Sequence, residues 1–234
     1  MAAGALTLAI ETSNPPVQGG GSVALGRVGD HMELLGERSL APEGRHDDAL
    51  MPAIDALCRE HRVAARALKR VCASAGPGGY TAVRIGVTTA KMIAEASGAV
   101  CVGVPTACVA AHDAFGRLGV EAVIVTLAWK RGLGWSGVVR AAAPGVVERV
   151  GVRDAPGLAT LMRESGVGVC LGDAHLPEAA RDAVAATGGR IEALRLSAGA
   201  CLAASRWFGG ADPARVTPIY PREPEAVRVW RART

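Results

Sequence analysis

A glycine-rich turn between a short apolar segment and a long amphipathic one constrains the fold of this chain most. Residues 71–74 (VCAS) predict a buried strand, because a short apolar run suits the interior of a sheet. The turn AGPGGY follows, and from Thr81 to Ser97 apolar residues recur at helical spacing. Gly98 stands where a helix-ending glycine is expected. This strand–turn–helix order is typical of α/β domains.

The same alternation continues along the chain. We predict strands over residues 6–10, 22–28, 32–38, 99–104, 123–127, 136–140, 146–150 and 167–171, and helices over 46–61, 106–115, 157–165, 177–186 and 198–208. Pro52 favours a helix start or a kink near its position. The glycines near residues 116–119 favour a boundary there, so we expect two lobes, 1–116 and 117–234, the second including an irregular tail from Ala211.

The composition of the chain excludes some classes of function. Lys and Arg total 26 against 22 for Asp and Glu, a net charge of +4, which excludes the polybasic surface of a dedicated nucleic-acid binder. The six cysteines form no C-x-x-C pair and read as reduced, buried thiols of a cytosolic protein. Residues 1–11 lack a basic region, and no apolar stretch reaches the ~18 residues of a spanning helix. We therefore expect a cytoplasmic protein without a membrane segment.

The glycine-rich turn is the first candidate site. Backbone N–H groups at the start of a helix attract anions, and glycines let a ligand approach the backbone. We predict anion or nucleotide contacts at Gly76, Gly78, Gly79 and Thr81, with Thr81 as the helix N-cap. The alternative is a tight turn that only packs the helix against the sheet. Neither G-x-x-x-x-G-K-[ST] nor G-x-G-x-x-G is present.

Glu11, at the end of the first predicted strand, is the second candidate. It is the nearest carboxylate to the first loop, and a carboxylate there could contact a nucleotide or a metal ion.

Several motifs, in order, resemble the TsaB (YeaZ) family. The segment SAGPGGYTAVRIG (residues 74–86) is similar to the family signature, which is close to GPGSFTGLRIG. LAIETS, GGSVAL, RHDDALMPAIDAL, VGVPT and TPIYPR are similar to further family segments, and the match is fullest over residues 5–115. The resemblance implies an α/β fold of two actin-like lobes with mixed sheets, of the actin, sugar-kinase and Hsp70 type.

The resemblance also implies a function. TsaB-like proteins are non-catalytic partners of TsaD, which forms N6-threonylcarbamoyladenosine (t6A) at position 37 of tRNAs that read ANN codons. A TsaD-like subunit, a TsaE-like ATPase and, only indirectly, tRNA are then the expected partners. A TsaD-like enzyme holds a metal with an H-x-x-x-H helix, but here Cys108 stands four residues before His112. We therefore expect no catalytic residues, no metal and no enzymatic activity of the chain alone.

By the same resemblance, the helices that begin near His46 and Thr81 lie side by side and dock on TsaD. The candidate contact residues, some of which must instead face the chain's own sheet, are Leu50, Met51, Ile54, Val83, Arg84, Val87 and Met92. Arg84 is expected to serve the partner or an anion at this interface. In isolation the same surface could form a homodimer. We expect no bound cofactor and leave open ATP or ADP at the partner interface.

Two alternatives remain beside the accessory subunit. The first is an ATP-binding phosphotransferase or ATPase of the same fold. The second is a metallopeptidase, which the missing second histidine disfavours. The family's D-A-R-x-x-E-V-Y stretch also diverges, because Ala128, Leu133 and Trp135 stand where Asp, Glu and Tyr are expected.

Overall fold

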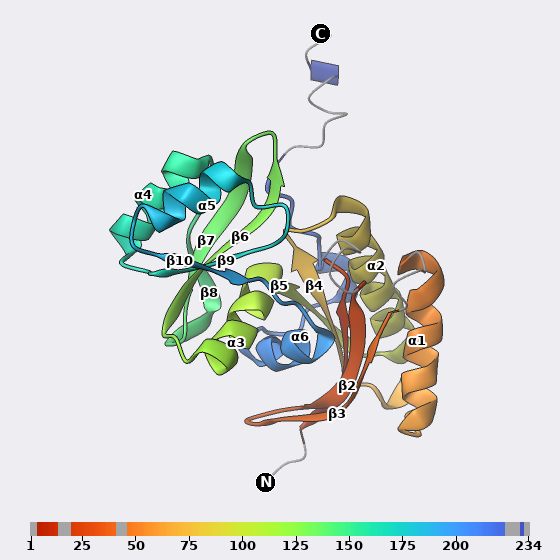
Figure 1. Ribbon diagram of the computed structural model, residues 1–234. Helices are drawn as coiled ribbons and strands as arrows, with labels where there is room; N and C mark the ends of the chain where they lie inside the picture. Colours follow the sequence, from red (N-terminus) through yellow and green to blue (C-terminus); the bar gives the residue numbers. More distant parts are fainter. Residues whose placement is uncertain (1–3, 14–19, 41–45, 223–229, 232–234) are drawn as a thin grey trace.

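The computed structural model describes residues 4–13, 20–40, 46–222 and 230–231 (Figure 1). The strands are β1 (Ala5–Glu11), β2 (Ser22–Val28), β3 (Met32–Ser39), β4 (Arg70–Gly76), β5 (Val100–Pro105), β6 (Ala122–Lys130), β7 (Leu133–Arg140), β8 (Ala143–Arg153), β9 (Val169–Gly172) and β10 (Arg190–Ala193). The α-helices are α1 (His46–Glu60), α2 (Tyr80–Ser97), α3 (Thr106–Leu118), α4 (Ala155–Ser165), α5 (Glu178–Ala185) and α6 (Ala198–Ala204). Short 3-10 turns are η2 (Ala65–Ala67), η3 (Ser205–Trp207) and η4 (Pro213–Arg215).

Two five-stranded mixed sheets share one topology. The first has the order β3-β2-β1-β4-β5 and the second the order β10-β9-β6-β7-β8. In each sheet the first three strands form an antiparallel meander, and the last two pair in parallel beside the first. In this arrangement β6 corresponds to β1 and β9 corresponds to β4. This is the predicted two-lobed α/β architecture. The two lobes share a topology, although the sequence shows no strong repeat between them.

Helices cover both faces of the first sheet (Figure 1). Leu50 and Leu57 of α1 and Val83 and Val87 of α2 pack with β1 and β2 residues such as Leu8 in one core. The other face of the sheet packs against α3 and α6. The helix α6 thus follows β10 of the second sheet in sequence but completes the core of the first.

The second sheet is covered by α4 and α5 on one face, with Leu158, Met162 and Val184 in its core. Ala107, Ala110, Ala111 and Ala114 of α3 pack on its other face. Figure 1 shows α3 and α6 between the two sheets, with α1 and α2 on one side of the molecule and α4 and α5 on the other. The boundary predicted between residues 116 and 117 falls within α3 and stays a prediction.

The C-terminal segment spans both lobes. Ala211 and Cys101 exchange backbone hydrogen bonds of 2.9 and 3.1 Å beside β5. The Ile219 N–H donates to the carbonyl oxygen of Ala75 at the end of β4, 2.6 Å away. Arg222 then donates from its guanidinium to the carbonyl oxygens of Lys130 and Leu133, in the turn between β6 and β7. This segment therefore joins the first sheet to the second.

Most predicted elements are confirmed, with three local corrections. The helix α1 runs without interruption through Pro52 and begins at His46, so a start at Pro52 is wrong. The predicted helix over 198–208 ends at Ala204 and continues as η3, where Arg70 donates to the carbonyl oxygens of Ser205 and Phe208. The short strand β10 was not predicted. Gly98 does end α2, with a φ of 71°.

Two helical glycines make a matched test of the packing between α2 and β1. A Cβ on Gly86 of α2 would overlap Thr12 Oγ1, which is fixed by a 2.8 Å hydrogen bond to the Ala82 carbonyl oxygen. A Cβ on Gly116 of α3 would meet no atom within 4 Å. We expect Gly86→Ala to lower the free energy of unfolding by about 1–3 kcal/mol through overpacking. We expect Gly116→Ala to raise it by up to about 1 kcal/mol, because alanine favours the helix.

Urea denaturation followed by circular dichroism measures both effects. Equal changes in the two variants would show that Gly86 is not held against the end of β1.

Candidate functional site

Two loops of the first sheet are tied together where β1 and β4 end. The Gly79 N–H donates to the carbonyl oxygen of Ser13, 3.0 Å away. A Cβ on Gly78 would overlap that same carbonyl oxygen, so only glycine allows the loop to lie this close. The helix α2 begins directly after this contact. Gly79 is its N-cap, and in the part of the chain that the structure describes no side chain caps the helix.

Glu11 lies buried beneath this junction. Its Oε1 accepts hydrogen bonds from the Ser13 backbone N–H at 2.6 Å and from Ser13 Oγ at 2.5 Å. Its Oε2 is buried and has no hydrogen-bond partner among the described residues. Burial raises the pKa of the Glu11 carboxyl, while hydrogen bonds from Ser13 and Ser74 oppose the rise. A further hydroxyl pair, Ser74 and Thr106 at 2.9 Å, extends this polar cluster into α3.

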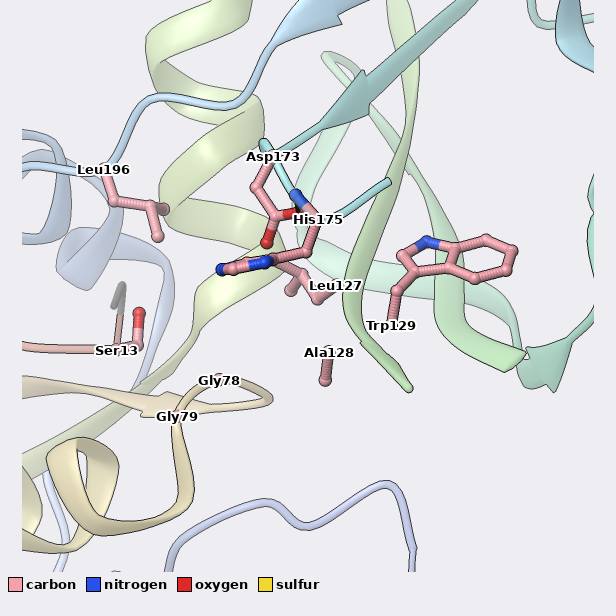
Figure 2. A pocket seen from close by; sticks show the side chains of 9 residues that line it. All are labelled: Ser13, Gly78, Gly79, Leu127, Ala128, Trp129, Asp173, His175 and Leu196. Carbon is pink, nitrogen blue, oxygen red and sulfur yellow. Dashed lines mark hydrogen bonds between the residues drawn. The ribbon is translucent and has the colours of Figure 1, made fainter. Parts of the chain in front are cut away.

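A cavity of about 230 Å³ lies between the two lobes, above this junction (Figure 2). Its lining residues are Ser13, Gly78, Gly79, Leu127, Ala128, Trp129, Asp173, His175 and Leu196. They follow or end strands β1, β4, β6, β9 and β10. The topologically equivalent strands of both sheets therefore direct their carboxyl ends to one cavity, which is where open α/β sheets bind ligands.

The second lobe gives the cavity its charge. Asp173 directly follows β9 and is 8% exposed, and its Oδ1 accepts a hydrogen bond from the His175 backbone N–H at 2.9 Å. Figure 2 shows its carboxylate and the His175 ring on the side of the cavity opposite Gly78 and Gly79. Trp129 is held by a 2.6 Å hydrogen bond from its Nε1 to Thr126 Oγ1. Ala128, where the family has Asp, adopts a φ of 56°.

The structure separates the predicted anion contacts. Gly78 and Gly79 line the cavity. Gly76 does not, because it is buried against the carbonyl oxygen of Ile219. Thr81 is exposed within the first turn of α2 and is not its N-cap, which corrects that prediction. Glu11 is covered and holds Ser13 in place, so it is not itself among the lining residues.

Sequence reasoning predicted only Gly78 and Gly79 among the lining residues, and the polar ones that it missed include Ser13, Asp173 and His175. Each follows a strand that points into the cavity, so polar residues directly after predicted strands were the available signal. ATP or ADP at a partner interface stays a prediction.

The predicted docking residues divide into two groups. Leu50, Ile54, Val83 and Val87 are core residues of the first lobe, which removes them from direct contact with any partner. They were included because the helical pattern alone does not show which apolar face meets the chain's own sheet. Met51 and Met92 are exposed on α1 and α2, and the Arg84 guanidinium carbon lies 5.3 Å from the Tyr80 ring centre.

By the resemblance, the helix that holds a metal in TsaD-like enzymes corresponds to α3. Burial lowers the pKa of His112, as does the nearby charge of Arg206. Burial raises the pKa of the Cys108 thiol to about 12, so it stays protonated. Within the described ranges, no group of three or more His, Cys, Asp or Glu side chains could hold a metal ion. No described helix is long and apolar enough to cross a bilayer.

The pKa of Glu11 generates a prediction for stability. A carboxyl whose pKa is raised in the folded state stabilises the fold below its ordinary value of 4.5 and loses that contribution as pH rises through the raised value. Glu11→Gln keeps an oxygen for the two Ser13 donors and removes the titration. We expect the variant to gain stability relative to the parent chain as pH rises from about 4.5. Urea denaturation at several pH values measures this difference.

The matched control is Glu178→Gln, at the exposed start of α5. Because the Glu178 side chain is exposed, Glu178→Gln should not reproduce the gain of stability with rising pH that burial gives Glu11→Gln. A stability difference for Glu11→Gln that does not change with pH would contradict the raised pKa of the buried carboxyl.

Several known proteins are similar to this chain in sequence. Residues 40–125 match the family model of TsaD, tRNA N6-adenosine threonylcarbamoyltransferase. Uncharacterized proteins of Mycobacterium bovis and Mycobacterium tuberculosis are 29% identical to this chain over 225 residues. That alignment covers 94% of this chain and 92% of each relative.

Two solved structures from Pseudomonas aeruginosa share the fold. One is an uncharacterized protein described as similar to the peptidase YeaZ, with a TM-score of 0.74 and 20% identity over 93% of this chain and all of the other. The second is YeaZ, with a TM-score of 0.72 and 20% identity over 92% of this chain and 99% of the other. The predicted resemblance is thus confirmed: this chain is similar to the TsaB (YeaZ) and TsaD proteins and has their two-lobed, actin-like α/β fold.

Proposed function

We propose that this chain serves t6A modification of tRNA as a non-catalytic subunit that docks on a TsaD-type partner through the outward faces of α1 and α2. The match of residues 40–125 to TsaD and the YeaZ-like fold support a role in that modification system. The observation that supports the accessory role and the docking face is a stripe of exposed side chains along α2.

This stripe consists of Tyr80, Arg84, Thr88 and Met92. Residues four apart lie on one face of a helix, and all four are exposed. Met92 is 66% exposed, an unusual position for an apolar side chain on a helix whose other face forms the core. Arg84 is the one charge in the stripe. A surface so poor in charge suits burial against another protein.

The helix α1 lies beside α2 (Figure 1). It presents Met51, which is 52% exposed. Methionine adapts its shape to a partner surface. At the start of α2, the Tyr80 ring lies 4.9 Å from the Tyr220 ring, and Arg84 lies over Tyr80. These contacts position Arg84 for a carboxylate or another anion of the partner.

The α3 helix supports an accessory role for the chain. Cys108 is buried, and His112 has no described group of further ligands around it, so the pair does not offer a catalytic metal site. One structural neighbour is described as similar to a peptidase, and that description concerns the neighbour alone. A TsaE-like ATPase, indirect contact with tRNA, homodimer formation in isolation and a cytoplasmic location belong to the same proposal.

Charge reversal on the exposed methionines tests the docking face. We expect Met92→Glu and Met51→Glu each to weaken binding to the cognate TsaD-type subunit by at least tenfold, about 1.4 kcal/mol, because a carboxylate would be buried without a partner. Affinity measured by isothermal calorimetry on purified subunits and the yield of t6A in a reconstituted reaction report the effect. Arg84→Ala should lower the affinity less, since it leaves the apolar contact.

Val146→Glu is the matched control. Val146 is similarly exposed, at 53%, but lies on β8 of the second sheet. It should bind like the parent chain, and a weaker Val146→Glu complex beside unaffected methionine variants would move the docking face to the second lobe. Sustained ATP turnover by the purified chain without partners would instead favour the ATPase alternative.

A further inference from the structure

The C-terminal segment from Ile219 to Arg222 lies between the start of α2 and the turn that joins β6 to β7. Its first residue is fixed against the first lobe. The Ile219 N–H donates to the Ala75 carbonyl oxygen, and a Cβ on Gly76 would overlap the Ile219 carbonyl oxygen. The segment therefore starts from a fixed point at the end of β4.

Tyr220 attaches the same segment to the exposed stripe of α2. The ring centres of Tyr220 and Tyr80 lie 4.9 Å apart, a separation at which aromatic rings attract one another. Arg84, one helical turn further along α2, lies over the Tyr80 ring and donates from Nη1 to the Tyr80 hydroxyl oxygen, 3.4 Å away. Tyr80 is 49% exposed and Tyr220 is 38% exposed. A protein that covers Tyr80 therefore also restrains Tyr220.

Arg222 attaches the other end of the segment to the second lobe. Its guanidinium donates to the carbonyl oxygens of Lys130 and Leu133, the pair of residues that closes the β6–β7 hairpin. One planar group thus spans both sides of the turn, which a lysine ammonium cannot reproduce. Within the turn, Arg131 has a φ of 54°, which is uncommon for a residue other than glycine. Contacts from outside the turn therefore help to hold it.

The β6 side of this turn continues into the wall of the cavity between the lobes. Ala128 and Trp129 directly precede Lys130, and both line the cavity (Figure 2). The pairing of β6 with β7 is interrupted between Leu127 and Lys130, and Ala128 has a φ of 56°. An interrupted ladder has fewer hydrogen bonds to resist local opening. The order of this cavity wall therefore depends on how firmly the turn is held.

We propose that residues 219–222 couple the exposed stripe of α2 to the cavity between the lobes. A partner that covers Tyr80 and Arg84 restrains Tyr220, which stands two positions before Arg222, and so orders the β6–β7 turn and the cavity wall that follows it. Coupling of this kind is reciprocal, so an ordered turn also strengthens docking. The choice of a TsaD-type subunit as partner rests on the proposed function, whereas the coupling itself belongs to the chain alone.

Hydrogen exchange of the full chain without a partner tests the coupling. We expect Arg222→Ala to speed amide exchange in residues 127–134 by at least about fivefold, because the turn loses both guanidinium hydrogen bonds. Tyr80→Ala changes only the other side of the segment, and it should speed the same exchange by at least about twofold. Exchange in residues 6–10 of β1 should not change in either variant, which shows that the fold is intact.

Matched variants separate coupling from local damage. Tyr80→Phe keeps the ring contact with Tyr220, and Met92→Ala changes the far end of the same stripe. Both should exchange like the parent chain. Arg222→Lys, which keeps the charge but not the planar group, should lie between the parent chain and Arg222→Ala. The double variant Tyr80→Ala, Arg222→Ala should exchange like Arg222→Ala alone, because the broken link no longer transmits the change.

The complex tests the direction of the coupling. A saturating TsaD-type subunit should slow exchange in residues 127–134 by at least about threefold in the parent chain but not in Arg222→Ala. The proposal is overturned if Tyr80→Ala leaves this exchange unchanged, or if its effect adds fully to that of Arg222→Ala. A bound subunit that slows the exchange equally in both chains, or in neither, also overturns it. If the subunit does not bind, the docking proposal fails, and the measurements on the chain alone still decide the coupling.

Discussion

Helix α3 contributes side chains to two hydrophobic cores, and the joining of the lobes depends on how small those side chains are. Cys108 and Val109 pack with α6 and the first sheet, while Ala107, Ala110 and Ala114 pack with the second. Alanine lets the helix backbone come close to both sheets, and at such positions added volume is costly. The chain has few aromatic residues, at 3%, and the one on α3, Phe115, packs only partly buried against the core of the second sheet.

The fold was largely predictable because its elements obey local rules. The strand β4, the turn after it and α2 follow from a short apolar run, glycines and helical spacing, and Gly98 ends the helix as expected. The strand β10 escaped prediction because its four residues, RIEA, are half charged and its side chains are half-buried or exposed. The packing of α6 against the first sheet could not be predicted from the sequence either, because it is a long-range contact that leaves no local sequence pattern.

The candidate site was predictable only in part, for a related reason. Gly78 and Gly79 are visible because glycines before a helix have a recognisable role. Asp173 and Ser13 become neighbours of one cavity only when two lobes with the same topology face each other, and no spacing in the sequence encodes that. The docking helices show the same limit. The apolar residues of α1 and α2 were predicted as one set of contact residues, but burial assigns Leu50 and Val83 to the core and leaves Met51 and Met92 exposed.

The residues from Ala211 to Arg222 have a practical consequence for handling the protein. They are hydrogen-bonded to β5, to the end of β4 and finally to the turn between β6 and β7, so they link the first sheet to the second. A chain shortened before Ile219 would keep α1 to α6 and both sheets, but it would lose the hydrogen bonds that join this segment to the end of β4 and to the turn between β6 and β7. The two lobes of such a chain would still be joined by the packing of α3 in both cores.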